Sequence, residues 1–248
     1  MSNVVTGFDQ LACHYDALWN NTTVGMSQRR AVWRWVDPLF RRGDWIFDLG
    51  CGTGEDATHF QKRGVEVYAI DASAEMVRLA QARGVNAHQK TIDCISNMGR
   101  KFDGVICNFG VLNCVEQPGS VALALSRLIR SGGKVAICVM GPCCLWEVCY
   151  FLWCGKPHKA LRRFTEGKAP SSIGVDVSYP SNQQWTEAFG QEFSLLNWYG
   201  IGLCVPPSYV RKLSDALVLR FSAMDQYIAH LPGLRALADH RLFIFERL

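Results

Sequence analysis

The chain has 248 residues, of which 49% are hydrophobic and 19% charged, and its formal net charge is +4. This composition is typical of a folded globular protein and argues against intrinsic disorder. The small, scattered positive charge gives no indication of nucleic acid as a partner. No apolar run approaches the ~20 residues of a membrane-spanning helix, and no secretory signal opens the chain. We therefore expect a cytoplasmic protein.

The cysteines, eleven in number, are many for a reducing compartment. Without an export signal we nevertheless expect them as reduced thiols. No two of them have the spacing C-x-x-C, which counts against a structural zinc site. The sequence therefore predicts no bound metal.

The first 140 residues alternate between short apolar runs and segments with helical spacing. Apolar runs without alternation are typical of buried parallel strands. The predicted strands are 45–49, 65–70, 85–91, 102–108 and 134–140, and the predicted helices are 57–63, 74–83 and 121–129. Ser73 is the expected N-cap of the second helix, and Gly132–Gly133 is expected to end the third. This order predicts an α/β fold with ligands at the carboxyl ends of the strands.

Beyond residue 140 the regular alternation stops. A helix at 185–189, a strand at 193–205 and a last strand at 241–247 are still expected there. We interpret 1–248 as one domain, made of N-terminal cap helices at 1–40, a cofactor-binding core at 41–140, and two lid or substrate insertions at 141–182 and 206–239.

The glycine-rich run 48–54 lies where the first strand passes into the first helix. Glycines permit a tight turn and the close approach of a ligand to the backbone. A dinucleotide fingerprint needs a glycine at 55, but Glu55 and Asp56 stand there, where a phosphate would have to bind. We therefore expect a cationic nucleoside such as S-adenosylmethionine, whose ammonium Asp48 would help to hold. The alternative is that Asp48 caps a turn.

Three further side chains follow strands at the same edge of the sheet. Asp71 ends the second strand, where a carboxylate can accept hydrogen bonds from both ribose hydroxyls. Met76 is expected either against an adenine face or in the helix core. Asp93 follows the third strand, either as an acceptor for an adenine amino group or as an ordinary surface residue.

The runs 47–54, 67–76 and 102–108 together resemble the class I S-adenosylmethionine-dependent methyltransferases of small-molecule type. The resemblance implies a Rossmann-like, seven-stranded α/β sheet, mostly parallel with an antiparallel last strand and helices on both faces. It also implies S-adenosylmethionine as cofactor and S-adenosylhomocysteine as product. The cofactor-binding residues that it implies are Asp48, Gly50, Cys51, Gly52, Gly54, Asp71, Ala72, Met76, Asp93, Cys94, Asn108, Phe109 and Gly110.

Residues 108–113 depart from the N-P-P-[FY] pattern of enzymes that methylate amide or ring nitrogens in nucleic acids and proteins. This departure disfavours such substrates. Phe8-Asp9 and His14-Tyr15-Asp16 resemble the helix that folds over the cofactor in small-molecule methyltransferases. The resemblance implies that Tyr15 contacts the cofactor and that Arg30 meets its carboxylate. Aromatic packing and a solvated charge are the alternatives.

Methyl transfer from a sulfonium needs mainly orientation and the exclusion of water. A general base is needed only when the acceptor begins protonated. The candidate catalytic residues are Tyr15, His14 and Asn113, and the further candidate bases are Tyr179, Tyr209 and His240. No spacing singles out one of them.

Segment 143–154 has one charge, Glu147, and as a helix it would be apolar on every side. We therefore expect it to be buried or to lie against an apolar surface. The basic residues that follow are Lys156, Lys159, Arg162, Arg163 and Lys168, of which 159, 162 and 163 share a helical face. This pattern favours an apolar pocket wall with a basic rim. A membrane-surface helix, or a core helix followed by a solvated one, is the alternative.

The sequence thus predicts methyl transfer to oxygen or nitrogen of a small, hydrophobic metabolite. Four alternatives stay open. The same cofactor and fold would serve cyclisation or decarboxylation, the chain would bind the cofactor without catalysis, it would be a dinucleotide oxidoreductase, or it would be a thiol-dependent arsenic methyltransferase. The acceptor and the oligomeric state are not indicated, and peripheral membrane contact stays open.

Overall fold

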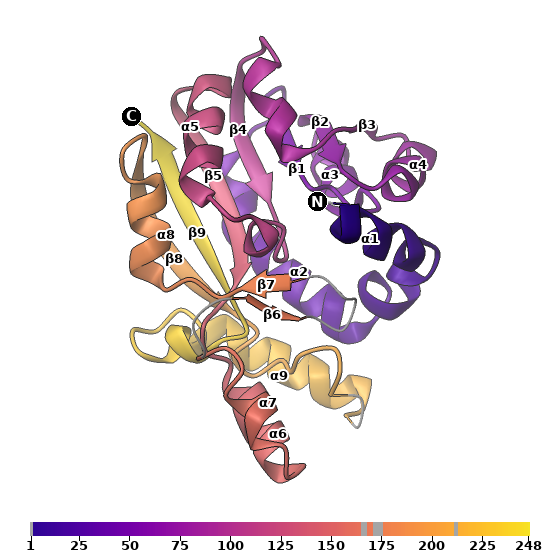
Figure 1. The fold of residues 1–248 in the computed structure, drawn as a ribbon, viewed down its shortest axis with the longest axis vertical. Coiled ribbons are helices and arrows are strands. Elements are labelled where there is room, and N and C mark those ends of the chain that lie inside the picture. Colours follow the sequence, from indigo (N-terminus) through magenta and orange to yellow (C-terminus); the bar gives the residue numbers. More distant parts are fainter. Residues whose placement is uncertain (1, 165–167, 171–175, 211–212) are drawn as a thin grey trace.

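A seven-stranded sheet with the order β3-β2-β1-β4-β5-β9-β8 runs through the centre of the molecule (Figure 1). The computed structural model describes residues 2–164, 168–170, 176–210 and 213–248. The strands of this sheet are β1 (Trp45–Leu49), β2 (Glu66–Asp71), β3 (Asn86–Gln89), β4 (Phe102–Cys107), β5 (Ile129–Met140), β8 (Phe193–Ile201) and β9 (His240–Arg247). Only β9 runs antiparallel to its neighbours β5 and β8, and the other pairs are parallel. The predicted fold class is therefore confirmed.

Helices cover both faces of the sheet. The α-helices in the described part of the chain are α1 (Ser2–Tyr15), α2 (Thr23–Val36), α3 (Glu55–Lys62), α4 (Ala74–Ala82), α5 (Pro118–Leu128), α6 (Leu145–Trp153), α7 (Pro157–Ala160), α8 (Asn182–Phe189) and α9 (Asp215–Ile228). One buried cluster joins the sheet to α5 and α8, and a second joins it to α2, α3 and α4. A small two-stranded sheet pairs β6 (Lys168–Pro170) with β7 (Asp176–Ser178).

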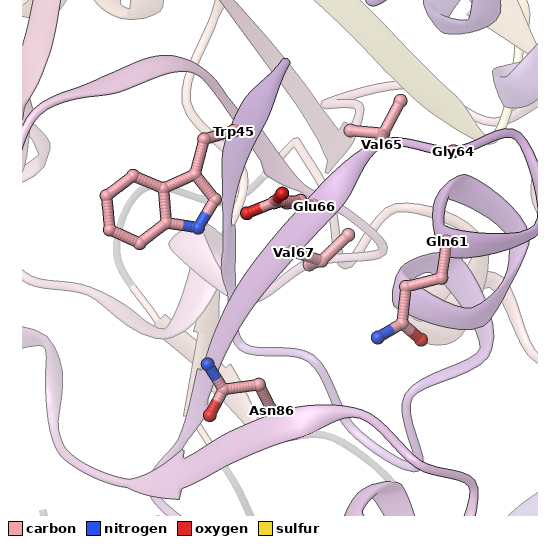
Figure 2. Close-up of a pocket in the computed structure, with 7 residues that line it drawn as sticks. All are labelled: Trp45, Gln61, Gly64, Val65, Glu66, Val67 and Asn86. Atoms are coloured by element: carbon pink, nitrogen blue, oxygen red, sulfur yellow. The ribbon is translucent and has the colours of Figure 1, made fainter. Parts of the chain in front are cut away.

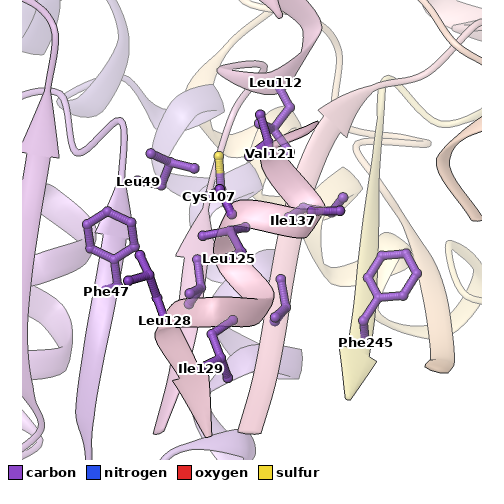
Figure 3. Packing of buried hydrophobic residues seen from close by; sticks show 14 of the residues in the cluster. Phe47, Leu49, Cys107, Leu112, Val121, Leu125, Leu128, Ile129, Ile137 and Phe245 are labelled. Atoms are coloured by element: carbon purple, nitrogen blue, oxygen red, sulfur yellow. The ribbon is translucent and has the colours of Figure 1, made fainter. Parts of the chain in front are cut away.

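The central strand β1 shows how the two layers are built. Phe47 and Leu49 point into the buried cluster that includes Leu125 and Leu128 of α5, as Figure 3 shows. Ile46 points to the opposite face, against α2 and α3. Because side chains alternate along a strand, Asp48 shares the face of Ile46 and is directed toward these two helices.

The structure also corrects two local predictions. Helix α5 ends at Leu128, and Gly132–Gly133 lie inside β5 instead of ending a helix, because strand pairing with β4 already begins at Ile129. Segment 143–154 forms α6, but most of its apolar side chains are not in the core, and Trp153 is 92% exposed. The expectation of a core helix is wrong for this segment. The N-cap at Ser73 is present, since its hydroxyl accepts a hydrogen bond from the Met76 N–H.

Candidate active site

The glycine loop after β1 is held at the carboxyl end of the sheet by its backbone. The N–H groups of Gly50 and Cys51 both donate to the Ile70 carbonyl of β2, at 2.9 Å. A side chain at Gly50 would collide with Val111, whereas one at Gly52 would meet nothing within 4 Å. Both glycines have a positive φ, which side chains other than glycine adopt at a cost. The open space at Gly52 therefore lets a ligand approach the backbone.

A buried ion pair lies beside this loop. Asp56, in the first turn of α3, accepts hydrogen bonds from Arg29 and from Trp33 Nε1 of α2, and from Asn108 Nδ2 after β4. Burial opposes the ionisation of Asp56, but the Arg29 guanidinium outweighs burial and lowers the pKa of this carboxyl. Residues from α2, from α3 and from the loop after β4 thus meet around this ion pair, which we call the charged junction.

Three polar atoms near this junction are buried and have no hydrogen-bond partner. Asp48 Oδ2 and Asn108 Oδ1 are acceptors, and Arg29 Nε is a donor. Burial raises the pKa of Asp48 well above its ordinary value, and the nearby Asp56 adds to this rise. Unpaired buried groups are uncommon in proteins and call for a partner. By charge, an ammonium group suits the two acceptors and a carboxylate group suits the donor.

The carboxylate of Asp71 ties two turns together at the end of β2. Its Oδ2 accepts from the Gly52 N–H at 2.8 Å, and its Oδ1 accepts from the Ser73 N–H at 2.9 Å. Ala72 is half-buried beside it, and Met76 is buried in the first turn of α4. Burial raises the pKa of Asp71. The side chain therefore lies at the carboxyl end of β2, against the glycine loop.

Asp93 and Cys94 lie further along the same edge of the sheet. Both are exposed at the start of a 3₁₀ turn, Ile92–Asn97, which follows β3. The Cys94 N–H donates to the Thr91 carbonyl. Neither side chain lines the cavity beside the glycine loop.

An N-terminal segment closes over the glycine loop. Asp16, directly after α1, pairs with Arg83 and accepts from Thr53 Oγ1 at 2.7 Å and from Asn20 Nδ2 at 2.6 Å. The cavity left between this segment, Arg29 and the loop has a volume of about 30 Å³. That is room for about two water molecules. A ligand of nucleoside size therefore requires the segment around Asp16 to move outward.

Of the three N-terminal residues predicted for the site, one lines this cavity and two do not. Tyr15 lines it, and burial raises the pKa of its phenol. His14 and Arg30 are exposed to solvent and do not line it. Arg29, one position before Arg30, lines the cavity, although nothing in the sequence distinguishes it from Arg30. Adjacent residues on a helix point about 100° apart, so only the docking of α2 determines which arginine faces inward.

Phe109 separates the cavity from a second group of side chains. It is the only non-glycine residue with a positive φ, 55°, in the part of the chain that the structure describes. Its ring makes edge contacts with Trp19 at 5.8 Å and with His240 at 5.4 Å between centroids. His240 is buried, and its Nδ1 lies 3.3 Å from Asp239 Oδ2. Strained backbone of this kind is frequent at functional sites.

Asn113, a predicted catalytic residue, is buried. Its Nδ2 donates to the carbonyls of Met140 and Ser178, and its Oδ1 accepts from the Met140 N–H. The amide is therefore engaged with the backbone of β5 and β7. Gly110, next to it, is buried against Met140. This arrangement fixes the loop that carries Phe109.

The basic residues of the first insertion do not form the predicted rim. Arg162 and Arg163 both bind the buried carboxylate of Glu147, and Arg163 also binds Asp239. Helix α7 is only four residues long, so the expected shared helical face of 159, 162 and 163 is absent. Tyr209 donates to Glu147, and Tyr179 lies beneath the Arg163 guanidinium. The side chain of Lys168 lies outside the described residues.

A larger pocket, of about 400 Å³, lies at the other end of the sheet. Figure 2 shows it between Gln61 of α3 and the residues Trp45, Glu66 and Asn86, which begin β1, β2 and β3. In open α/β sheets ligands bind outside the carboxyl ends of the strands. This pocket is at the amino ends, and we assign it no role.

Comparison with known proteins supports one family. Residues 46–133 match a family model described as a methyltransferase domain. The chain is 30% identical over 145 residues to a demethylmenaquinone methyltransferase of Thermobifida fusca, covering 55% of this chain and 60% of the relative. It is 30% identical over 97 residues to a ubiquinone biosynthesis O-methyltransferase of Xanthomonas oryzae, covering 36% and 40%. The chain thus spans about half the length of these curated relatives.

A solved structure extends the likeness to nearly the whole chain. The 1,6-didemethyltoxoflavin-N1-methyltransferase of Burkholderia thailandensis, with its substrate and S-adenosylhomocysteine bound, matches with a TM-score of 0.60. The match covers 99% of this chain and 87% of that one, at 17% identity. At such low identity the match shows a shared fold. Among the helices that the structure describes, none is long and apolar enough to cross a membrane.

Proposed function

We propose that this chain, whose residues 46–133 match a methyltransferase domain, is a class I S-adenosylmethionine-dependent methyltransferase and transfers the cofactor's methyl group to an oxygen or nitrogen atom of a small, apolar metabolite. The observation that carries the proposal is the set of unpaired buried atoms of Asp48, Asn108 and Arg29. Two acceptors and one donor match the ammonium and carboxylate of a methionine-derived ligand. When bound, the cofactor supplies a methyl group on a sulfonium, which is already a good leaving group.

In this proposal each element of the site holds one part of the cofactor. Asp48 and Asn108 bind the ammonium, and Arg29 takes the carboxylate contact that the sequence assigned to Arg30. Asp71 accepts from the ribose hydroxyls, and the 3₁₀ turn with Asp93 borders the adenine. These assignments follow the order of the strands, since β1, β2 and β3 end side by side at this edge.

The proposed binding region for the methyl acceptor begins at Phe109. Its ring, with Trp19 and His240, forms an aromatic boundary that suits an apolar acceptor. Relatives named for O-methylation and N-methylation share the family or the fold, and either acceptor atom begins protonated in a hydroxyl or an ammonium. The proposed base is His240, whose Nδ1 lies 3.3 Å from the carboxylate of Asp239. Tyr15, whose pKa is raised, serves as a neutral hydrogen-bond donor.

The test is a product assay with the full chain. Wild-type protein is incubated with methyl-labelled S-adenosylmethionine and a panel of small apolar alcohols, phenols and amines, and the products are identified by mass spectrometry. We expect S-adenosylhomocysteine and a methylated product in equal amounts. His240→Gln should lower kcat about 100-fold without changing cofactor affinity, whereas His158→Gln, on exposed α7, should leave kcat unchanged.

Two results would contradict the proposal. If the cofactor binds but no member of the panel yields S-adenosylhomocysteine above the level of Asp48→Asn, the chain is a binding protein with respect to these acceptors. If a substrate is converted without S-adenosylhomocysteine being formed, the cyclisation or decarboxylation alternative takes its place.

A further inference from the structure

Helix α6 exposes apolar side chains and buries its charged one, the opposite of an ordinary surface helix. Its one charged side chain, Glu147, is 1% exposed, whereas Trp153 at its end is 92% exposed. Leu152 on the same helix, and Leu161 and Phe164 after α7, are each about half exposed. A surface helix normally turns its charged face to water and its apolar face to the core. Here apolar side chains cover the outside of the α6–α7 unit, which we define as residues 145–164.

The buried carboxylate explains why the helix is held in this orientation. Glu147 accepts two hydrogen bonds from Arg162, at 2.7 and 2.8 Å, one from Arg163 at 2.9 Å and one from Tyr209 at 2.8 Å. This network fixes the charged face of α6 inward, against the segment that precedes α9. The remaining apolar face is therefore turned outward. In Figure 1 α6 and α7 project away from the sheet, so this face has access to a large surface.

The charges on the unit have one sign. Between residues 141 and 164 the only acidic residue is Glu147, and it is buried and neutralised by its arginine partners. Lys156 and Lys159 are exposed beside the apolar side chains. Tryptophan is enriched where a bilayer meets water, and each lysine near an anionic bilayer strengthens its attraction. We propose that the α6–α7 unit docks the protein on an anionic lipid bilayer, with Trp153 and Leu152 inserted among the headgroups.

The charge pattern favours a bilayer over a second copy of the chain. In a twofold dimer the same patch would face itself, so that Lys156 and Lys159 of both copies would be brought together. An anionic bilayer offers the opposite charge and an apolar layer at once. The proposal concerns where the protein binds and does not depend on the acceptor or on the methyl-transfer reaction.

Vesicle co-flotation of the full chain tests the proposal. We expect the wild-type protein to bind vesicles of phosphatidylcholine mixed with phosphatidylglycerol more strongly than vesicles of phosphatidylcholine alone, and less strongly at high salt. Trp153→Ala should weaken the partition at least about tenfold. Lys159→Glu should weaken it at least about fivefold. The matched controls are Leu123→Ala, at an exposed position of α5, for Trp153→Ala, and Lys62→Glu on α3 for Lys159→Glu.

A second measurement identifies the inserted residue. Brominated lipids should quench part of the tryptophan fluorescence of the wild-type protein, and Trp153→Phe should retain binding but lose most of this quenching. The proposal is overturned if the wild-type protein does not bind the anionic vesicles, or if Trp153→Ala binds them as the wild type does. A dimer in light scattering that Trp153→Ala converts to a monomer would overturn it in favour of a second copy. Circular dichroism confirms that each variant is folded.

Discussion

The carboxylate of Asp71 offers the most direct test of the cofactor site. In the folded protein it accepts hydrogen bonds from the Gly52 and Ser73 N–H groups. In the proposed complex it also accepts from two ribose hydroxyls. A hydrogen bond to a charged group contributes about 1.5–3 kcal/mol. Because Asp71 is partly open to water, we take the lower figure, and loss of both ribose contacts costs about 3 kcal/mol, or about 100-fold in affinity.

Calorimetric titration with S-adenosylhomocysteine measures this loss. Asp71→Ala should bind about 100-fold more weakly than the wild type, and Asp71→Asn should fall in between, since its amide oxygen can still accept. The matched control is Asp44→Ala. Asp44 also accepts from a backbone N–H, that of Arg41, but at the amino end of β1. If Asp71→Ala binds within about threefold of the wild type, or if Asp44→Ala loses as much, the assigned ribose contact is refuted.

Two buried carboxylates give predictions that depend on pH. The pKa of Asp48 is raised by burial, and a bound ammonium would lower it. Cofactor affinity should therefore rise with pH until Asp48 is ionised in the free protein. Titration calorimetry in buffers of different ionisation enthalpy should show proton release on binding, and Asp48→Asn should abolish it. Glu147 is the opposite case. Burial opposes its ionisation, but Arg162 and Arg163 outweigh burial and lower its pKa. The stabilisation that ionised Glu147 gives the folded protein is complete above the ordinary glutamate pKa. It is lost as the pH falls through the lowered pKa of Glu147 in the folded protein. Glu147→Ala should lower the free energy of unfolding by about 3–5 kcal/mol at neutral pH in urea denaturation, and a loss below about 1 kcal/mol would contradict the assigned network.

The core of the fold could be predicted because its signals are local. The strands that became β1, β2 and β4 are short apolar runs bounded by glycines or polar residues, and the period of their side chains needs no tertiary information. The boundaries of the helices and strands were harder to predict. Helix α5 ends at Leu128, before the glycine pair, because β5 already pairs with Phe102 of β4. No pattern within 121–133 indicates a pairing with a strand more than 20 residues earlier.

The sequence indicates the positions of side chains that follow strands, but not of those that depend on how helices dock. Asp48 and Asp71 stand at strand ends, so their location is fixed by the order of the sheet. Arg29 and Arg30 are equivalent in the sequence, and only the packing of α2 on α3 directs Arg29 to Asp56. The burial of Glu147 was likewise hidden, because its arginine and tyrosine partners come from a turn and from a second insertion.

The structure also changes the physical reason for the cofactor preference. From the sequence alone, Glu55 and Asp56 are expected to repel a phosphate at the start of α3. In the structure Arg83 pairs with Glu55 and Arg29 pairs with Asp56, so both carboxylates are largely neutralised. The Oδ2 atom of Asp48, by contrast, is buried and has no hydrogen-bond partner. We therefore propose that Asp48, at the end of β1, selects the cationic nucleoside, and that the two acids of α3 act by holding the arginines that enclose the site.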